Sequence, residues 1–257
     1  MIVCRSAAEI SKMRAANQFV AEVLAELEAA VRPGVTTADL DRLAETLVRD
    51  GGAVPAFKGY RGFPATLCAS INDEVVHGIP SPKRALKDGD IISLDVGAKL
   101  GGYFGDSAVT VPVGKVPDET LRLLDATREA LDRAIAQVQV GGRLSDIGHA
   151  VQQWVEAAGF SIVREFVGHG IGEKLHEEPQ IPNYGVPGRG PRLAAGMVLA
   201  IEPMVAMGRP DTRVLADGWT AVTKDGSLAA HFEHTVAVSA EGPQVLTARK
   251  SAPAAAR

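Results

Sequence analysis

The sequence predicts an α/β (α+β) protein with a duplicated fold, in which two helix–helix–strand–strand halves meet about a pseudo-twofold axis. The stretch from Leu86 to Asp95 and the stretch from Leu193 to Glu202 each contain a glycine turn, an apolar run and a closing carboxylate, 107 residues apart. The same offset relates Gly34 to Gly141, Asp39 to Asp146, Val48 to Val155 and Gly52 to Gly159. Chance similarity between two amphipathic stretches could explain the matches within the helices. It does not explain two carboxylates at matched positions, which favour a duplication. An internal repeat therefore sets the expected architecture.

Each half is expected to begin with two amphipathic helices. The first helices cover about residues 7–30 and 118–138, where apolar residues recur at helical spacing. In the first half, Thr36 or Thr37 caps the second helix, and Gly51-Gly52 ends it. In the second half, Ser145 is the expected cap of the corresponding helix.

A second pair of matched strands follows the first carboxylates. The strand that starts at Asp106 resembles the strand that starts at Glu233, at an offset of 127 residues. The second half therefore has twenty extra residues in the intervening loop, and this loop is a plausible place for substrate contacts. Because Asp106 follows the Gly101-Gly102 turn, Asp95 and Asp106 can lie side by side across a hairpin.

At 257 residues the chain could form one large domain or two small ones. The duplication favours one domain over residues 1–250, with halves at about 7–113 and 114–247 and a flexible tail at 251–257. The chain is 46% hydrophobic and 23% charged, with a net charge of −4 and no basic stripe, which disfavours specific nucleic-acid binding. No run approaches the ~18–20 apolar residues of a membrane span. Two cysteines, Cys4 and Cys68, are too few for a disulfide framework, so a cytoplasmic protein is expected.

The four matched carboxylates predict a metal centre. Asp95 ends an apolar run, where an ionised carboxylate is costly unless it is paired or coordinated. Glu202 and Glu233 repeat the arrangement of Asp95 and Asp106, and four converging carboxylates would repel one another by several kcal/mol. Two divalent ions roughly 3.5–4 Å apart, bridged by carboxylate oxygens, resolve this conflict.

Three of the six histidines lie in glycine-rich or acidic segments: His77, His169 and His176. Glycines on both sides of His169 are expected to let the backbone approach an ion or ligand closely. An imidazole favours Zn, Fe or Co over Mg. His149, in the middle of a helix, and His231, on a strand, are expected to have ordinary surface or packing roles.

Seven segments occur together in a characteristic order. They are Asn72-Asp-Glu-Val-Val-His77-Gly-Ile-Pro80, Leu94-Asp95-Val96, Gly105-Asp106, Gly168-His169-Gly-Ile-Gly172, His176-Glu-Glu-Pro179, Ile201-Glu202-Pro-Met204 and Phe232-Glu233-His234-Thr235. From about residue 5 to residue 247 the chain resembles the type I methionine aminopeptidases, in a bacterial-like form. The resemblance implies the pita-bread metallopeptidase fold, which agrees with the 107-residue repeat.

The resemblance also implies roles for individual residues. It implies that two divalent ions (Co, Mn, Fe or Zn) are held by Asp95, Asp106, His169, Glu202 and Glu233. Glu202 would also take the proton from the bridging water as general base. His77 would hydrogen-bond the scissile amide and help to protonate the leaving amine, and His176 would stabilise the oxygen of the tetrahedral intermediate. The wall of the methionine pocket would be formed by Phe57, Tyr60, Phe63, Cys68, Leu175 and Trp219.

The implied activity is removal of the initiator methionine from nascent proteins and peptides with a small second residue. The implied protein is a cytoplasmic monomer that visits the ribosome transiently. Only 31 positions separate Glu202 from Glu233, which leaves no room for the helical insertion of the type II enzymes. Two alternatives are an Xaa-Pro peptidase of the same fold and a non-catalytic binding protein. The second alternative is disfavoured because such proteins lose metal ligands, whereas all five are present in this chain.

Overall fold

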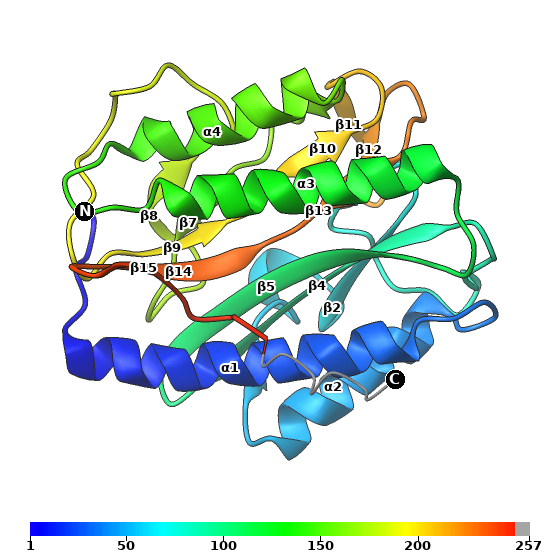
Figure 1. Cartoon of the computed structure of the whole chain (residues 1–257). Helices are drawn as coiled ribbons and strands as arrows, with labels where there is room; N and C mark the ends of the chain where they lie inside the picture. The colour runs from blue at the N-terminus through cyan, green and yellow to red at the C-terminus, as the bar shows by residue number, and fades with distance from the viewer. Residues whose placement is uncertain (250–257) are drawn as a thin grey trace, which may run out of the picture.

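The computed structural model describes residues 1–249, and within them the order of two helices followed by strands occurs twice (Figure 1). The first half contains α1 (Ala7–Ala30), α2 (Thr37–Asp50), β1 (Val54–Pro55), a short 3₁₀ helix (Tyr60–Gly62), β2 (Leu67–Ile71), β3 (Glu74–Val76), β4 (Ile91–Leu100) and β5 (Tyr103–Pro112). The second half contains α3 (Asp118–Ala136), α4 (Leu144–Ala157), β6 (Ser161–Ile162), β7 (Gly168–Gly170), β8 (Glu177–Ile181), β9 (Val198–Ile201), β10 (Met204–Ala206), β11 (Thr212–Val214), β12 (Ala221–Thr223), β13 (Ala229–His231), β14 (His234–Ser239) and β15 (Gly242–Val245). The predicted duplicated fold is confirmed. The boundaries of the two halves stay a prediction, and the predicted tail at 251–257 lies outside the described residues.

Helix caps explain where the helices start. Thr36 caps α2 as predicted: its hydroxyl accepts from the Asp39 amide, and the Asp39 carboxylate accepts from the Thr36 amide, which forms a capping box. The prediction that Ser145 caps α4 is wrong. Arg143 occupies the cap position, and Ser145 lies inside the helix, where its hydroxyl donates to the Arg189 carbonyl at 2.9 Å. The serine thus fastens a neighbouring loop to the first turn of the helix.

Strands β4 and β5 form a hairpin that positions the first two carboxylates. Both turn residues, Gly101 and Gly102, have positive φ values (59° and 93°), as a two-residue type I′ turn requires. The register pairs Asp95 with Ala108 and Gly97 with Asp106. Asp95 and Asp106 therefore lie on the same face of the hairpin at diagonal positions, within reach of a shared ligand.

The second pair of carboxylates, Glu202 and Glu233, lies at the end of the hydrogen-bond ladder between β9 and β14. Strand β9 pairs with β14 so that Ile201 faces His234, and Glu202 and Glu233 are the next residues beyond that pair. Pro203 follows Glu202 and cannot donate to a ladder, which accounts for the interruption between β9 and β10. The second half therefore presents its carboxylates where two strands break off, unlike the continuous hairpin of the first half.

Hydrogen bonds join the two halves next to the carboxylates. The Glu233 amide donates to the Ala108 carbonyl at 3.0 Å, and the Ser107 hydroxyl donates to the Glu233 carbonyl at 2.8 Å. The Thr235 hydroxyl donates to the Asp106 carbonyl at 2.9 Å. We call these contacts between β5 and residues 233–235 the seam. The seam fixes the separation between Asp106 and Glu233, which come from different halves.

The helices cover the outer faces of the strands. Figure 1 shows α3 and α4 in the upper part of the view and α1 and α2 in the lower part, with strands such as β5 and β14 between α3 and α1. The largest apolar cluster includes Leu24 of α1, Leu123 of α3 and strand residues such as Leu94, and it extends through both halves. A second apolar cluster, around Phe57 and Leu175, lies apart from it. None of the helices in the described part of the chain has the length and apolar character to cross a membrane.

Candidate active site

The structure brings the four predicted carboxylates together in a buried cluster. Asp106 and Glu233 are 4% and 3% exposed, and Asp95 and Glu202 are only partly exposed. Among the described residues, Asp95 Oδ1, Asp106 Oδ1 and Glu233 Oε1 are buried oxygens without a hydrogen-bond partner. Burial, followed by repulsion from the neighbouring carboxylates, raises the pKa of Asp106 and Glu233 well above the ordinary range. Such a cluster needs cations for its charges to coexist at neutral pH.

His169 presents a ring nitrogen to this cluster. Its Nδ1 lies 2.9 Å from the Gly170 carbonyl, which can only accept, so Nδ1 carries the proton and Nε2 keeps a free lone pair. Ligand atoms of Asp106, His169 and Glu233 all lie within 4.8 Å of one another. His169 Nε2 is also 3.6 Å from Glu202 Oε1. This set of carboxylate oxygens and one imidazole fits a divalent cation such as Mn, Fe, Co or Zn.

The glycines that flank His169 bring the backbones of neighbouring strands close together, and their expected approach to an ion stays a prediction. A Cβ at Gly168 would lie 2.4 Å from the Ala200 carbonyl oxygen, and a Cβ at Gly170 would lie 2.2 Å from that of Glu178. Both glycines thus allow β7 to pack closely against the neighbouring backbone of β8 and β9. This close packing of β7 fixes the position of the imidazole between the two glycines.

His77 lies on the opposite side of the cavity in a strained backbone conformation. Its φ is +61°, in the left-handed region that residues with a side chain seldom adopt. The next residue, Gly78, is pressed against β2, where a Cβ would lie 2.4 Å from the Ala69 carbonyl oxygen. Burial, together with nearby His231, lowers the pKa of His77 to about 4, so this imidazole is neutral at pH 7.

His176 stands at the mouth of the cavity and still reaches solvent. Its Nδ1 lies 2.9 Å from the Tyr60 hydroxyl, and its ring centre is 4.3 Å from that of His169. Burial, followed by the nearby His169 and Arg61, lowers the pKa of His176 to about 3. The ring is therefore a neutral hydrogen-bonding group at pH 7, and Tyr60 orients it.

A single cavity of about 170 Å³ contacts the carboxylate cluster and all six residues predicted for the methionine pocket. It is lined by Phe57, Tyr60, Arg61, Phe63, Cys68, His77, Asp95, Asp106, His169, Leu175, His176, Glu202, Trp219 and Glu233. The Phe63 and Trp219 rings meet edge to face, with centres 5.2 Å apart. Burial and the nearby Asp95 carboxylate raise the pKa of the Cys68 thiol, so Cys68 is a neutral wall residue.

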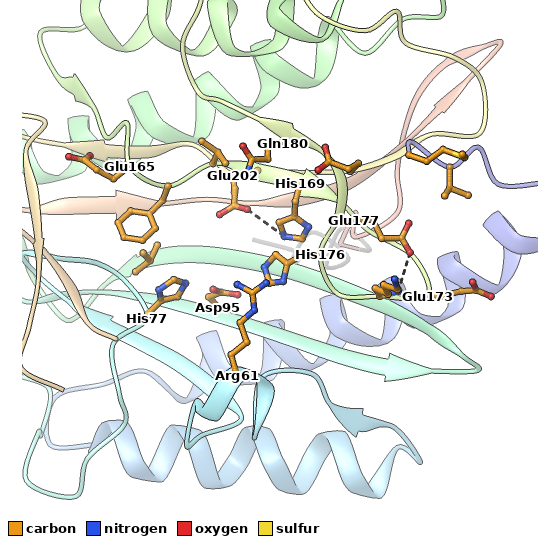
Figure 2. A pocket seen from close by; sticks show the side chains of 18 of the residues that line it. Arg61, His77, Asp95, Glu165, His169, Glu173, His176, Glu177, Gln180 and Glu202 are labelled. Atoms are coloured by element: carbon orange, nitrogen blue, oxygen red, sulfur yellow. Dashed lines mark hydrogen bonds and ion pairs between the residues drawn. The ribbon is translucent and has the colours of Figure 1, made fainter. Parts of the chain in front are cut away.

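A larger groove of about 850 Å³ shares Asp95, Glu202 and the three histidines with this cavity. Figure 2 shows His77 and Asp95 below, His169 and Glu202 above, and His176 beside them, around a common space. Arg61 extends into the same space from the 3₁₀ helix. The groove offers a path for a polymer whose end reaches the small cavity.

His231 is a residue of the site that the sequence interpretation missed. Instead of an ordinary packing role, it lies with Nε2 at 3.6 Å from Glu202 Oε2, and it is 1% exposed. The sequence did contain a signal for this position. Residues two apart in an extended strand point to the same side, and His231 precedes the predicted ligand Glu233 by two residues. His149 does lie away from the cavity, with Nδ1 3.2 Å from the Gly185 carbonyl.

A duplicated α/β fold that places two pairs of carboxylates and an imidazole around one cavity defines a metal-dependent hydrolase. Comparisons with known proteins specify which one. A model of metallopeptidase family M24 matches residues 11–240. The chain therefore belongs to metallopeptidase family M24.

Relatives within this family are similar over almost the whole chain. The methionine aminopeptidase of Clostridium acetobutylicum is 53% identical over 247 residues, covering 96% of this chain and 99% of the relative. Methionine aminopeptidase 1 of Mycobacterium tuberculosis is 51% identical, covering 95% of this chain and 94% of the relative.

Solved structures agree with these relatives. The crystal structure of methionine aminopeptidase from Rickettsia prowazekii has a TM-score of 0.95 at 41% identity, covering 96% of this chain and 100% of that one. A prolidase from Pyrococcus horikoshii has a TM-score of 0.78 at 21% identity, covering 97% of this chain and 65% of that one. The prolidase supports the fold alone.

Proposed function

We propose that this protein is a metal-dependent aminopeptidase that removes the N-terminal methionine from peptides and proteins. The observation that carries the proposal is the cavity in which an apolar pocket directly adjoins the carboxylate–imidazole cluster. A small pocket beside the reacting groups would accept one side chain at the end of a polymer, and the adjoining groove would accept the rest. Relatives about 50% identical over nearly the full length are named methionine aminopeptidases, which supports the same substrate.

The chemistry follows from the ligand set and its neighbours. Divalent cations held by Asp95, Asp106, His169, Glu202 and Glu233 would lower the pKa of a coordinated water and polarise the scissile carbonyl. Glu202 would accept the proton of the attacking water, since its carboxylate lies beside His169 at the open side of the cluster. In the metal-free protein, burial raises the pKa of Glu202 to about 7.

Two neutral imidazoles, His77 and His176, line the cavity next to the carboxylate cluster. His77 would hydrogen-bond the scissile amide and assist protonation of the leaving amine. His176, oriented by Tyr60, would donate to the developing oxyanion. In the pocket, Phe57, Phe63, Cys68, Leu175 and Trp219 offer an apolar wall that suits a flexible thioether.

The finer features of the activity belong to the same proposal. Two ions, rather than one, are proposed because five ligand residues surround the cavity. The natural substrates would be N-termini of nascent chains, which begin with methionine, and the resemblance to bacterial type I enzymes favours a small second residue. We propose transient ribosome contact, a monomeric state and cytoplasmic location on the same ground.

A comparison of two peptide classes tests the proposal. The protein loaded with Co²⁺ or Mn²⁺ should release methionine from Met-Ala peptides and leave Xaa-Pro peptides intact. An N-acetylated Met-Ala peptide is the matched control, and it should not be cleaved because it lacks a free α-amine. Cleavage of Xaa-Pro peptides alone would replace the proposal with an Xaa-Pro peptidase, and inactivity toward every methionyl peptide would favour a binding protein.

Replacing His176 by alanine should reduce kcat roughly 10²-fold, because a donor to the oxyanion is lost. The metal content should stay that of the parent protein, since His176 is hydrogen-bonded to Tyr60 and is not proposed as a ligand. Kinetics on a Met-Ala peptide and metal analysis of the same preparation measure both quantities. His149→Ala, which removes an imidazole outside the cavity, should change neither. Loss of metal in His176→Ala would contradict this assignment.

A further inference from the structure

His231 is a buried imidazole without a hydrogen-bond partner for its ring. It is 1% exposed, and neither Nδ1 nor Nε2 has a partner among the residues that the structure describes. A buried polar group left unpaired costs roughly 1–3 kcal/mol. A buried imidazole without a partner for either ring nitrogen therefore requires an explanation.

The backbone of His231 is held firmly. Its amide donates to the Thr110 hydroxyl at 2.8 Å, and the same hydroxyl donates to the His231 carbonyl at 2.8 Å. On the other side, β13 pairs His231 with Met204 of β10. These contacts hold the residue between β5 and β10, so the ring stays next to the carboxylate cluster.

The Glu202 carboxylate lies between two imidazoles. Oε1 is 3.6 Å from His169 Nε2, and Oε2 is 3.6 Å from His231 Nε2. A separation of 3.6 Å is too long for a hydrogen bond, but a movement of roughly 0.6 Å would bring the pair to the usual distance of ~3.0 Å. His169 has its Nδ1 proton on the Gly170 carbonyl and faces Glu202 with a lone pair. His231 has no such constraint and is able to face Glu202 with an N–H.

We propose that His231 is a positioning residue for the metal centre, whose Nε2–H donates to Glu202 Oε2 and thereby orients Oε1 toward the cation shared with His169. Carboxylates that ligate metals are commonly held by such a donor, and removing the donor costs ~10–100-fold in metal affinity or activity. The same bond would fix the orientation of Glu202 as a base, and only this second consequence rests on the proposed function.

Three variants of His231 test the proposal. In His231→Gln, the side-chain amide retains a donor at similar reach. His231→Leu removes the donor, and His231→Asn keeps an amide that is too short to reach Glu202. The binding of Co²⁺ to metal-free protein would be followed by calorimetry and by the visible absorption of the bound ion. Thr223→Val, which removes a buried hydroxyl bonded to the Ser227 carbonyl outside the cavity, controls for the loss of any buried polar group.

We expect the glutamine variant to bind Co²⁺ within about threefold of the parent, and the leucine and asparagine variants to bind it ~10–100-fold more weakly. Thr223→Val should bind it like the parent. If His231→Leu does not fold, His231→Asn carries the comparison. Parent-like affinity in the leucine or asparagine variant would overturn the proposal. An equal loss in the glutamine variant would also overturn it, by indicating that His231 is itself a ligand. Because Co²⁺ binding needs no peptide, these results stand apart from the choice of substrate.

Discussion

Replacing Glu202 by alanine is expected to abolish turnover of a Met-Ala peptide. A general base contributes ~10²–10⁴-fold to the rate. The substitution also removes the carboxylate that faces His169 Nε2 at 3.6 Å, so one ligand is lost together with the base. We therefore expect kcat/KM to fall at least ~10³-fold, measured at saturating Mn²⁺ so that weaker metal binding alone does not account for the loss.

Two further variants separate these effects. Glu202→Gln keeps the shape of the side chain and an oxygen ligand but cannot accept the proton, so it should be nearly as inactive while it binds more metal than the alanine variant. Asp125→Ala removes an exposed carboxylate on α3, outside both the cavity and the groove, and should leave kcat within about twofold. Near-normal turnover in Glu202→Ala would refute the proposed role of this residue.

Removal of metal is expected to make the stability of the protein fall as pH rises above about 6.5. Burial raises the pKa of Asp95 from 3.8 and of Glu202 from 4.5 to about 7, and it raises those of Asp106 and Glu233 further. The folded, metal-free protein therefore holds protons that the unfolded chain has already released. Stability declines with pH wherever the folded state binds more protons, and each proton contributes ~1.4 kcal/mol per pH unit.

Two histidines that line the cavity set the lower limit of that pH window. The pKa of His77 is lowered to about 4 and that of His176 to about 3, so their contribution to stability decreases as pH falls below the unfolded value of 6.5. This opposes the effect of the carboxylates in acid but is absent above pH 6.5. We therefore expect Tm of the metal-free protein to drop on the order of 10 °C between pH 6.5 and 8.5.

Thermal unfolding in the presence of a chelator measures this drop, and the same scans with saturating Mn²⁺ should be nearly flat over the same range. Asp106→Asn removes one of the four charges and should reduce the slope in the metal-free protein. A chelated protein that is equally stable at pH 6.5 and pH 8.5 would show that the carboxylates do not retain protons when the fold is intact.

The sequence was most informative where local pattern and repetition agreed. The 107-residue offset located both carboxylate pairs, because a glycine turn, an apolar run and an acidic end occur together twice. The Thr36 cap and the Gly101-Gly102 hairpin also follow from local chemistry. Each of these features depends on neighbours within a few residues along the chain.

The features that were missed depend on contacts between distant segments. Ser145 has the residue type of a cap, but the Arg189 carbonyl of a remote loop takes its hydroxyl. His231 looked like a packing residue because its neighbour Glu202 lies in a distant part of the sequence, just beyond the end of β9. Nothing near Arg5 in the sequence indicated that its guanidinium would be buried against Glu177, where both carboxylate oxygens accept at 2.7 Å. That ion pair fixes the chain one residue beyond His176.

The hydrogen bonds of the seam prevent the two halves from moving independently next to the metal centre. A hinge motion that parted them would break the bond from the Glu233 amide to the Ala108 carbonyl and the bond from Ser107 to Glu233, and it would pull Asp106 away from Glu233. We therefore expect peptides to enter and leave through the groove that is already open in this structure, without a hinge motion that separates the two halves. In hydrogen-exchange measurements, the Glu233 amide should accordingly be among the slowest in the chain to take up deuterium.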